Sequence, residues 1–449
     1  MAALAANRPG GLVGSASLTL LTRLAAFGFS LITNVILARS LGPEGRGVYA
    51  VAVMVAAVIG LLAQLGVGPA NVFHLSKQLI DLEELIGHSA SLALVVGTAC
   101  FLILLAYTRY SGSSEFLGVP SQLVLVASVS IPFSLLTVFL QSLMQGGQRF
   151  VQFNIVLLTQ YVSPAVTLMI AVILLHESTL GAVAAWTASA IVTCSVAVYC
   201  VAPLSKFSLR MRRTTLRSLL RFGLISYLGS VTSFVNYRFD VLIVNVFAGA
   251  RQVGLYTVGT GLAEIVWYLS NAASIVLAPR VAASEEIEAD RITEAVSRVV
   301  AFLAFVSAGV LAVFAPFLVV FFFGSAFAES AWAVWLLLPG IVTFSVGRIL
   351  SMYLLGRNKL TVDLLASFVG LVVTLALDLL LIPRFGFRGA AVASSIAYTG
   401  AMLVDLVWVV RNSTISPGRM LFARPQDAAM LWKRLKETAT GRLAAMGAR

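Results

Sequence analysis

The sequence predicts an all-α integral membrane protein of about twelve transmembrane helices in two similar halves, and three observations support this fold class. First, 59% of the 449 residues are hydrophobic and 11% are charged, whereas soluble domains have about 45–50% apolar and about 25% charged residues. Second, the chain contains many apolar runs near the length of about 20 residues that a helix needs to cross a bilayer. Third, the second half repeats features of the first at a nearly constant offset.

The apolar runs are expected, in chain order, at residues 14–38, 47–73, 88–107, 121–145, 153–175, 180–202, 222–247, 252–278, 297–322, 331–355, 361–382 and 388–410. Each is long enough to span the hydrocarbon core as a helix, which satisfies its own backbone hydrogen bonds there. The first run is too long for the core of a signal peptide and lacks a strongly basic start, so we expect it to remain in the mature protein.

Charge divides the chain into four segments. Residues 1–202 are predicted to form an N-terminal six-helix lobe and residues 222–410 a C-terminal six-helix lobe. Residues 203–221 between them combine many Arg residues with spaced Phe and Leu, a pattern that predicts a basic linker helix on the cytoplasmic membrane surface. Residues 411–449 are predicted to be a cytoplasmic tail, for which a helix on the same surface and a solvated coil are both compatible with the sequence.

The distribution of Lys and Arg predicts the orientation, because basic loops stay on the cytoplasmic side. With the N-terminus inside, 22 of the 31 Lys and Arg residues lie in cytoplasmic segments and six, including Arg39 and Arg46, lie in outer loops. The other three, Arg23, Arg238 and Arg348, lie within helices. Both termini are therefore predicted to be cytoplasmic. The net charge of +12 is assigned to contacts with anionic headgroups, and no nucleic-acid partner is expected.

An internal duplication relates the two halves. Gly42, Gly47 and Tyr49 match Gly249, Gly254 and Tyr256 at an offset of 207, and Gly181 matches Gly389 at 208. A repeat of six helices crosses the membrane an even number of times, so both copies enter from the same side. This is the parallel-repeat arrangement, with its axis along the membrane normal.

Two stretches carry a resemblance to a known family. VILARSLGPEGRGVY at 35–49 and LIPRFGFRGAAVA at 381–393 resemble the polysaccharide-transporter branch of the multidrug/oligosaccharidyl-lipid/polysaccharide exporter superfamily. The resemblance implies two six-helix lobes around a central cavity, alternating access without ATP hydrolysis, and flipping of undecaprenyl-pyrophosphate-linked sugars for a cell-surface polysaccharide. It also implies a bacterial cytoplasmic (inner) membrane location. Lipid II flippases, which are related, typically carry two extra helices, for which this chain has no apparent room.

Polar side chains within the apolar runs are the candidate substrate contacts, because polar groups in the bilayer are costly. In the first run, Thr19, Arg23, Ser30 and Asn34 share one helix face, and this face corresponds by the duplication to a polar face in the seventh run. An arginine suits a phosphate ligand because it stays charged and donates bidentate hydrogen bonds. The candidates for substrate binding are Arg23, Asn34, Gln64, Ser230, Tyr237, Arg238, Asn271 and Arg348.

Three carboxylates in the second half, Asp240, Glu264 and Asp378, are candidates either for binding a coupling ion or for salt bridges. Instead of binding substrate, Arg238 could form a salt bridge with Glu264 or Asp378. Arg348 could instead extend its charged end towards the cytoplasmic membrane surface. The polar residues as a group can equally serve as interhelical hydrogen-bonding groups.

Enzymatic functions lack their motifs in this sequence. There is no G-x-x-x-x-G-K phosphate loop followed by Ser or Thr, the three histidines are isolated, and no Ser or Cys nucleophile has a plausible base beside it. We therefore expect no enzyme, no catalytic residue, no cofactor and no metal.

The predicted function is a lipid-linked oligosaccharide flippase, and two alternatives remain. A flippase predicts cationic residues at the cavity, as Arg23 provides. A cation-coupled multidrug antiporter of the same superfamily favours an acidic residue in the first lobe. A membrane scaffold for polysaccharide synthesis does not account for the polar helix faces repeated in both lobes, because a scaffold gains nothing from the cost of burying them. The expected partners are a lipid-linked oligosaccharide and membrane lipids, with a polysaccharide polymerase and glycosyltransferases as further candidates.

Overall fold

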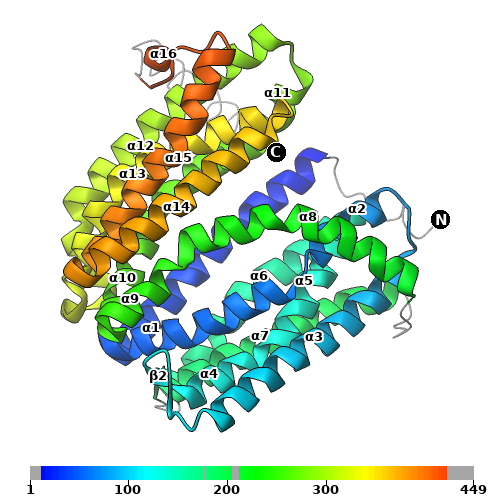
Figure 1. Ribbon diagram of the computed structural model, residues 1–449, viewed down its shortest axis with the longest axis vertical. Coiled ribbons are helices and arrows are strands. Elements are labelled where there is room, and N and C mark those ends of the chain that lie inside the picture. Colours follow the sequence, from blue (N-terminus) through cyan, green and yellow to red (C-terminus); the bar gives the residue numbers. More distant parts are fainter. Residues whose placement is uncertain (1–11, 175–177, 205–211, 422–449) are drawn as a thin grey trace, which may run out of the picture. The chain divides into compact units, whose positions relative to one another are not determined.

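The computed structural model describes residues 12–174, 178–204 and 212–421, which are helical over most of their length (Figure 1). They form two compact units. The first comprises 12–259 with 317–333 and 377–390, and the second comprises 260–316, 334–376 and the residues from 391 onwards. Nine of the described helices are long and apolar enough to cross a membrane. The predicted lobe boundaries stay a prediction.

The helices of the first half are α1 (Leu12–Ala63), α2 (Val67–Ser76), α3 (Leu82–Tyr110), α4 (Ser121–Ser128), α5 (Ser130–Gly146), α6 (Phe150–Leu168) and α7 (Thr179–Val201). The helices of the second half are α8 (Arg213–Arg238), α9 (Asp240–Ala248), α10 (Ala250–Ala263), α11 (Trp267–Ala283), α12 (Glu286–Phe323), α13 (Ser330–Gly356), α14 (Leu360–Phe385), α15 (Phe387–Asn412) and α16 (Pro417–Leu421). Short π and 3-10 segments lie at Met169–Leu174, Ala202–Leu204, Glu264–Val266 and Ser325–Phe327.

Wherever the structure describes them, the twelve predicted runs are helical except at the turn residues 64–66, 129 and 239, which confirms the all-α membrane fold class. A small addition is the hairpin of β1 (Glu115–Phe116) and β2 (Val119–Pro120) between α3 and α4. Leu117 and Gly118 form its two-residue turn with φ of 52° and 74°. Two positive φ values are the conformation that a tight antiparallel hairpin requires.

The first predicted run and most of the second lie in α1, which bends at Gly42. Gly42 has φ 66° and ψ −179°, and Pro43 follows it. Glycine adopts this backbone conformation without the steric cost that a Cβ brings. The prediction that Arg46 lies in an outer loop was wrong, because Arg46 lies in the helical segment after the bend and only 4% of it is exposed.

The structure supports the internal duplication at the residue level. Gly249, the repeat equivalent of Gly42, also has a positive φ, 82°. A Cβ on Gly47 would lie 1.7 Å from the carbonyl oxygen of Ala250, and a Cβ on Gly254 would lie 1.9 Å from that of Pro43. Since 43 and 250, like 47 and 254, differ by 207, the two contacts are equivalent. Reciprocal contacts of this kind are what a twofold relation between repeats produces.

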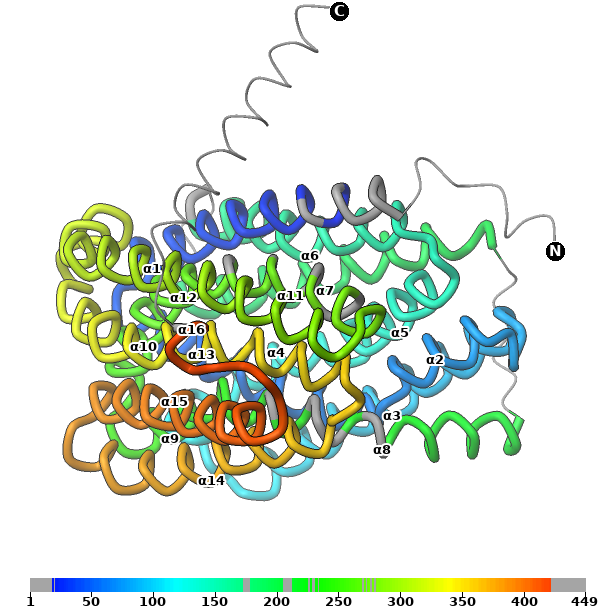
Figure 2. The backbone as a smooth tube through the Cα atoms, turned by 90° about the horizontal axis from the view of Figure 1, so that it is seen from above, coloured from blue at the N-terminus to red at the C-terminus, as the bar shows by residue number. Residues whose placement is uncertain are grey.

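Each unit contains its own apolar core. In the first unit, buried residues of α2, α3, α5, α6, α7 and α8 form one cluster, and Figure 1 shows α3, α5 and α7 side by side. In the second unit, a cluster joins α11, α12, α13 and α15, and Ile415 and Met420 beyond α15 complete it. Figure 2 shows α12, α13 and α15 along one another from above.

The end of the predicted linker helix belongs to the same helix as the start of the predicted seventh run. Residues 205–211 of that prediction lie outside the described part of the chain, and α8 runs without interruption from Arg213 to Arg238. Its first turns pack on α2. His88 Nε2 accepts a hydrogen bond from the Arg212 backbone N–H at 2.9 Å, and His74 Nε2 lies 2.9 Å from Ser218 Oγ. The start of α8 is therefore fixed to the first unit.

Candidate functional site

The polar face of α1 divides into residues with partners and one residue without. Thr19 Oγ1 accepts a hydrogen bond from Asn154 Nδ2 at 3.0 Å, and Asn34 Oδ1 accepts one from Arg46 Nη2 at 2.9 Å. Arg23 is exposed and has no hydrogen bond or ion pair with the rest of the described chain. One end of this face thus joins α1 to α6 and the other joins the two segments of α1 across its bend, while the guanidinium between them is available to a ligand.

Arg46 is a polar site residue that the sequence did not reveal. Its two terminal nitrogens donate to Asn34, to the side-chain oxygen at 2.9 Å and to the backbone oxygen at 3.2 Å. Its Nε is buried and has no hydrogen-bond partner in the described part. The spacing of 12 residues between Asn34 and Arg46 spans the bend at Gly42, so a contact between them depends on the geometry of that bend.

The other first-half candidate, Gln64, is partly buried in the turn between α1 and α2. Leu65 and Gly66 in this turn both have positive φ, 48° and 72°. A Cβ on Gly66 would lie 2.1 Å from the carbonyl oxygen of Gly223, so the turn lies directly against α8. Gln64 is placed at a point where three helices of the first unit meet.

The structure places three of the predicted residues, Ser230, Tyr237 and Arg238, along one helix, α8. Tyr237 and Arg238 are partly buried near its end, and both interact with other groups of the chain. Ser230 lies in α8, but its side chain falls outside the described part.

Asp240 and Asp378 lie near each other, but only Asp240 is satisfied by hydrogen bonds. Asp240 is 3% exposed; its Oδ1 accepts from the Val241 N–H at 2.7 Å and its Oδ2 accepts from the Tyr256 hydroxyl. Asp378 is fully buried in α14, and neither of its oxygens has a hydrogen-bond partner in the residues described. The two carboxylates are close enough to interact electrostatically. A buried ionised carboxylate is costly unless a proton or cation neutralises it.

The remaining candidates lie in the second unit. Asn271 is exposed in α11, and Glu264 is partly buried and interacts with other groups of the chain. Arg348 is partly buried in α13, and its buried Nε has no partner in the described part. Arg348 lies one turn from Phe344, which packs against Trp267 with ring centroids 4.7 Å apart.

Asp405 is a second buried carboxylate with an oxygen that lacks a partner among the described residues, and the sequence analysis did not select it. Asp405 lies in α15 with 5% exposure, and its Oδ1 has no partner among the described residues. Its signal in the sequence is a single acidic residue inside the last apolar run. The same reasoning that selected Asp378 applies to it.

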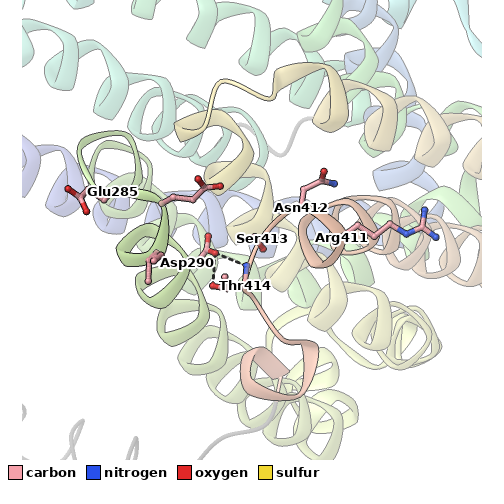
Figure 3. Close-up of a pocket in the computed structure, with 8 residues that line it drawn as sticks. Glu285, Asp290, Arg411, Asn412, Ser413 and Thr414 are labelled. Atoms are coloured by element: carbon pink, nitrogen blue, oxygen red, sulfur yellow. Dashed lines mark hydrogen bonds between the residues drawn. The ribbon is translucent and has the colours of Figure 1, made fainter.

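A pocket of about 660 Å³ lies where α12 begins and α15 ends. Figure 3 shows Asp290 directed at Thr414, with Glu285 and Arg411 at its margin. Asp290 is 1% exposed and accepts three hydrogen bonds: from the Thr414 N–H and Oγ1, each at 2.8 Å, and from the Tyr353 hydroxyl at 2.6 Å. With its acceptor capacity used in this way, Asp290 holds the segment after α15 in place. We assign the residue a structural role.

No metal centre is assembled by the part of the chain that the structure describes, in the sense that no three His, Cys, Asp or Glu side chains there are grouped to hold an ion. The three cysteines are free.

Comparisons with known proteins give one family and several related folds. Residues 36–332 match the model of a family described as polysaccharide biosynthesis protein. The probable low-salt glycan biosynthesis flippase Agl15 of Haloferax volcanii is 27% identical over 203 residues. That match covers 43% of this chain and 43% of the flippase, so the chain spans less than half the length of this curated relative.

Solved structures with the same fold are transporters. A lipid II flippase, MurJ, in an inward closed conformation has a TM-score of 0.74 at 15% identity, covering 90% of this chain and 89% of that one. An inward-facing multidrug resistance MATE transporter of the MOP superfamily has a TM-score of 0.67 at 16% identity, covering 87% of this chain and 97% of its own. Identities this low show the fold alone.

Proposed function

Because the chain belongs to the polysaccharide biosynthesis protein family, in the polysaccharide-transporter branch of its superfamily, we propose that it flips a lipid-linked oligosaccharide across the membrane. The observation that carries this proposal is Arg23, an exposed guanidinium on a helix long and apolar enough to span a membrane, with no hydrogen bond or ion pair to another described residue. A charge in that position costs free energy unless it meets water or an anion.

The proposed substrate is an undecaprenyl-pyrophosphate-linked sugar. Its pyrophosphate is a multidentate anion, and arginine donates paired hydrogen bonds to such oxygens. Arg23 in the first half and Arg348 in the second are the proposed phosphate contacts. Gln64, Ser230, Tyr237, Arg238 and Asn271 are the proposed contacts to the sugar hydroxyls. Asn34 is proposed to act through Arg46, to which it is hydrogen-bonded.

Alternating access is the proposed mechanism, and Asp378 with Asp240 is its proposed coupling group. A carboxylate that has no protein partner and lies close to a second carboxylate exchanges a proton or a monovalent cation more readily than one held in a salt bridge. Glu264 is the third candidate for this role. The proposed location is a bacterial cytoplasmic membrane, with both termini in the cytoplasm.

One observation favours a second function, a cation-coupled multidrug antiporter. Asp378, whose carboxylate has no hydrogen-bond partner among the described residues, serves cation exchange in either function, and the MATE fold is shared. The two functions differ at Arg23, which an anionic substrate requires and a cationic drug does not.

The test replaces Arg23 by Ala and, separately, by Lys in cells that assemble the surface polysaccharide. Losing a charge-assisted hydrogen bond of about 1.5–3 kcal/mol is expected to slow flipping by roughly 10- to 100-fold. Lipid-linked oligosaccharide should then accumulate in the cytoplasmic leaflet, with partial recovery for Lys. Arg109→Ala is the matched control, since Arg109 is also exposed and unpaired in the described chain but ends α3. Unchanged surface polysaccharide for Arg23→Ala at equal protein level contradicts the proposed site.

A further inference from the structure

A second pocket lies in the first unit, at the ends of α9 and α14 and the beginnings of α13 and α15. Its volume is about 400 Å³, and the turn that joins α14 to α15 forms much of its wall. This turn belongs to the stretch 381–393 that carried the family resemblance, and the substrate site proposed above does not use it. The orientation predicted from the charges places the pocket on the extracytoplasmic side.

The charges lining the pocket are predominantly positive. Arg384 and Arg388 both line it, and neither has a hydrogen bond or ion pair with another described residue. The acidic residue of the lining, Glu329, already pairs with Arg251 at 3.8 Å. Two guanidinium groups therefore share a cavity in which the carboxylate has a different partner.

The Arg388 side chain is held in a conformation suited to an anion. Its Cζ lies 5.0 Å from the ring centroid of Trp332 and 5.9 Å from that of Phe387. Stacking on an aromatic face engages the plane of the guanidinium and leaves the N–H groups at its edge free. Those edges match the spacing of two phosphate oxygens.

The turn itself is fixed by Gln252. Its Oε1 accepts a hydrogen bond from the Phe387 N–H at 3.4 Å. Gly386 has φ 57°, and a Cβ there would lie 2.9 Å from the same oxygen. The two arginines thus flank a turn whose shape is set before any ligand binds.

The surroundings favour a lipid as the source of the anion. Phe247 and Phe385 line the pocket and are 50% and 60% exposed, at the ends of apolar helices. Aromatic and arginine side chains together at the end of a span are typical of the membrane interface. An acyl chain can lie along such an apolar rim while the headgroup occupies the cavity.

The internal duplication does not repeat these two arginines. At the offset of 208 that relates Gly181 to Gly389, the first-half counterparts of Arg384 and Arg388 are His176 and Leu180. A charge pair present in one copy of a repeat and not in the other suits a ligand better than a structural need of the repeat.

We propose that this pocket, beside the turn that joins α14 to α15, binds the phosphate of an anionic membrane lipid through Arg384 and Arg388. The site is separate from the proposed substrate contacts, and its existence does not depend on the flippase function.

Native mass spectrometry of the purified full chain tests the proposal, with phosphatidylglycerol and phosphatidylcholine as competing probes. The wild type should retain one phosphatidylglycerol in preference to phosphatidylcholine, and Arg384→Gln with Arg388→Gln should reduce that preference by roughly tenfold or more, the effect of about 1.4 kcal/mol. Arg109→Gln, which removes an exposed arginine at another span end, should retain it.

Three results would overturn the proposal. One is equal retention of both lipids by the wild type, and another is an equal loss for Arg109→Gln and the double variant, which would indicate general interfacial attraction. The third is saturable binding of inorganic phosphate alone, measured as a change in fluorescence that depends on Trp332. This result would assign the pocket to a soluble anion. Size-exclusion profiles and melting temperatures matching the wild type ensure that the double variant is folded.

Discussion

At the residue scale, the two neighbouring carboxylates Asp240 and Asp378 differ in what a neutral substitution removes. Asp378→Asn removes a charge and no hydrogen bond to a described residue, whereas Asp240→Asn weakens acceptor bonds from Val241 and Tyr256. Bonds to charged groups contribute about 1.5–3 kcal/mol. We expect Asp378→Asn to keep or raise the melting temperature and Asp240→Asn to lower it, as measured by thermal unfolding in detergent.

The same pair of variants separates stability from coupling. Flipping driven by a proton or cation gradient should lose its gradient dependence in Asp378→Asn while the protein stays folded. A drop in melting temperature for Asp378→Asn as large as that for Asp240→Asn would mean that Asp378 has a structural partner, contrary to the arrangement described.

Asp290 gives the opposite expectation, because it is fully engaged. Asp290→Ala leaves the Thr414 N–H, the Thr414 hydroxyl and the Tyr353 hydroxyl without their acceptor. Unpaired buried donors cost about 1–3 kcal/mol each. The variant should show a lower melting temperature and faster hydrogen exchange over 413–421. Tyr353→Phe removes one of the three bonds and should show a smaller effect. Equal effects of the two variants would contradict the role assigned to Asp290 in holding the segment after α15.

At the element scale, the contact between α1 and α10 depends on two glycines. A Cβ at Gly47 or Gly254 would overlap a backbone oxygen of the opposing segment, at 1.7 Å and 1.9 Å. Overpacking typically costs about 1–3 kcal/mol, and backbone atoms relax less than side chains. Gly47→Ala and Gly254→Ala should each lower the melting temperature and the folded yield by similar amounts, since their contacts are equivalent.

Gly60→Ala and Gly261→Ala are the matched controls, because a Cβ at either position meets nothing within 4 Å. Alanine also has the higher helix propensity, so the controls should be neutral or slightly stabilising. Tolerance of Ala at 47 or 254 would show that these helices do not pack as closely as described.

The helices themselves were largely predictable from sequence, and the errors have local physical causes. Apolar runs determine where helices form, because the lipid leaves no other way to satisfy the backbone. The bend at Gly42 was expected as a loop, since Gly-Pro usually ends a helix. The beginning of α8 was expected as a separate surface helix because it is rich in Arg. Its contacts with the first unit, which involve His74, His88 and Thr215, are tertiary and cannot be read from the sequence.

The site was less predictable than the fold. Sequence alone selects charged and polar residues in apolar runs, as it did for Arg23, Arg348 and Asp378. It does not show which of them have partners: Asn34 is bound to Arg46 across a bend, and Asp378 has no partner in the described residues. These facts depend on tertiary distances, which a helical period does not contain.

At the scale of the whole molecule, the charge distribution predicts the topology. Ser114 is exposed between α3 and β1, and Lys359 is exposed between α13 and α14. In a variant without the three native cysteines, Ser114→Cys should react with a membrane-impermeant maleimide in intact cells, and Lys359→Cys should react only after permeabilisation. Labelling in the reverse pattern would contradict the orientation and move the proposed lipid pocket to the cytoplasmic side.

Transport of the lipid-linked sugar is the central claim, and reconstitution tests it most directly. Purified protein in vesicles is given a fluorescent pyrophosphate-linked oligosaccharide in both leaflets, and an impermeant quencher reports the accessible fraction. We expect the accessible fraction to rise from about half, the value for protein-free vesicles, towards completion with wild-type protein, and much more slowly with Arg23→Ala. An accessible fraction that stays at the protein-free value with folded wild-type protein, with or without a proton or cation gradient, would contradict it.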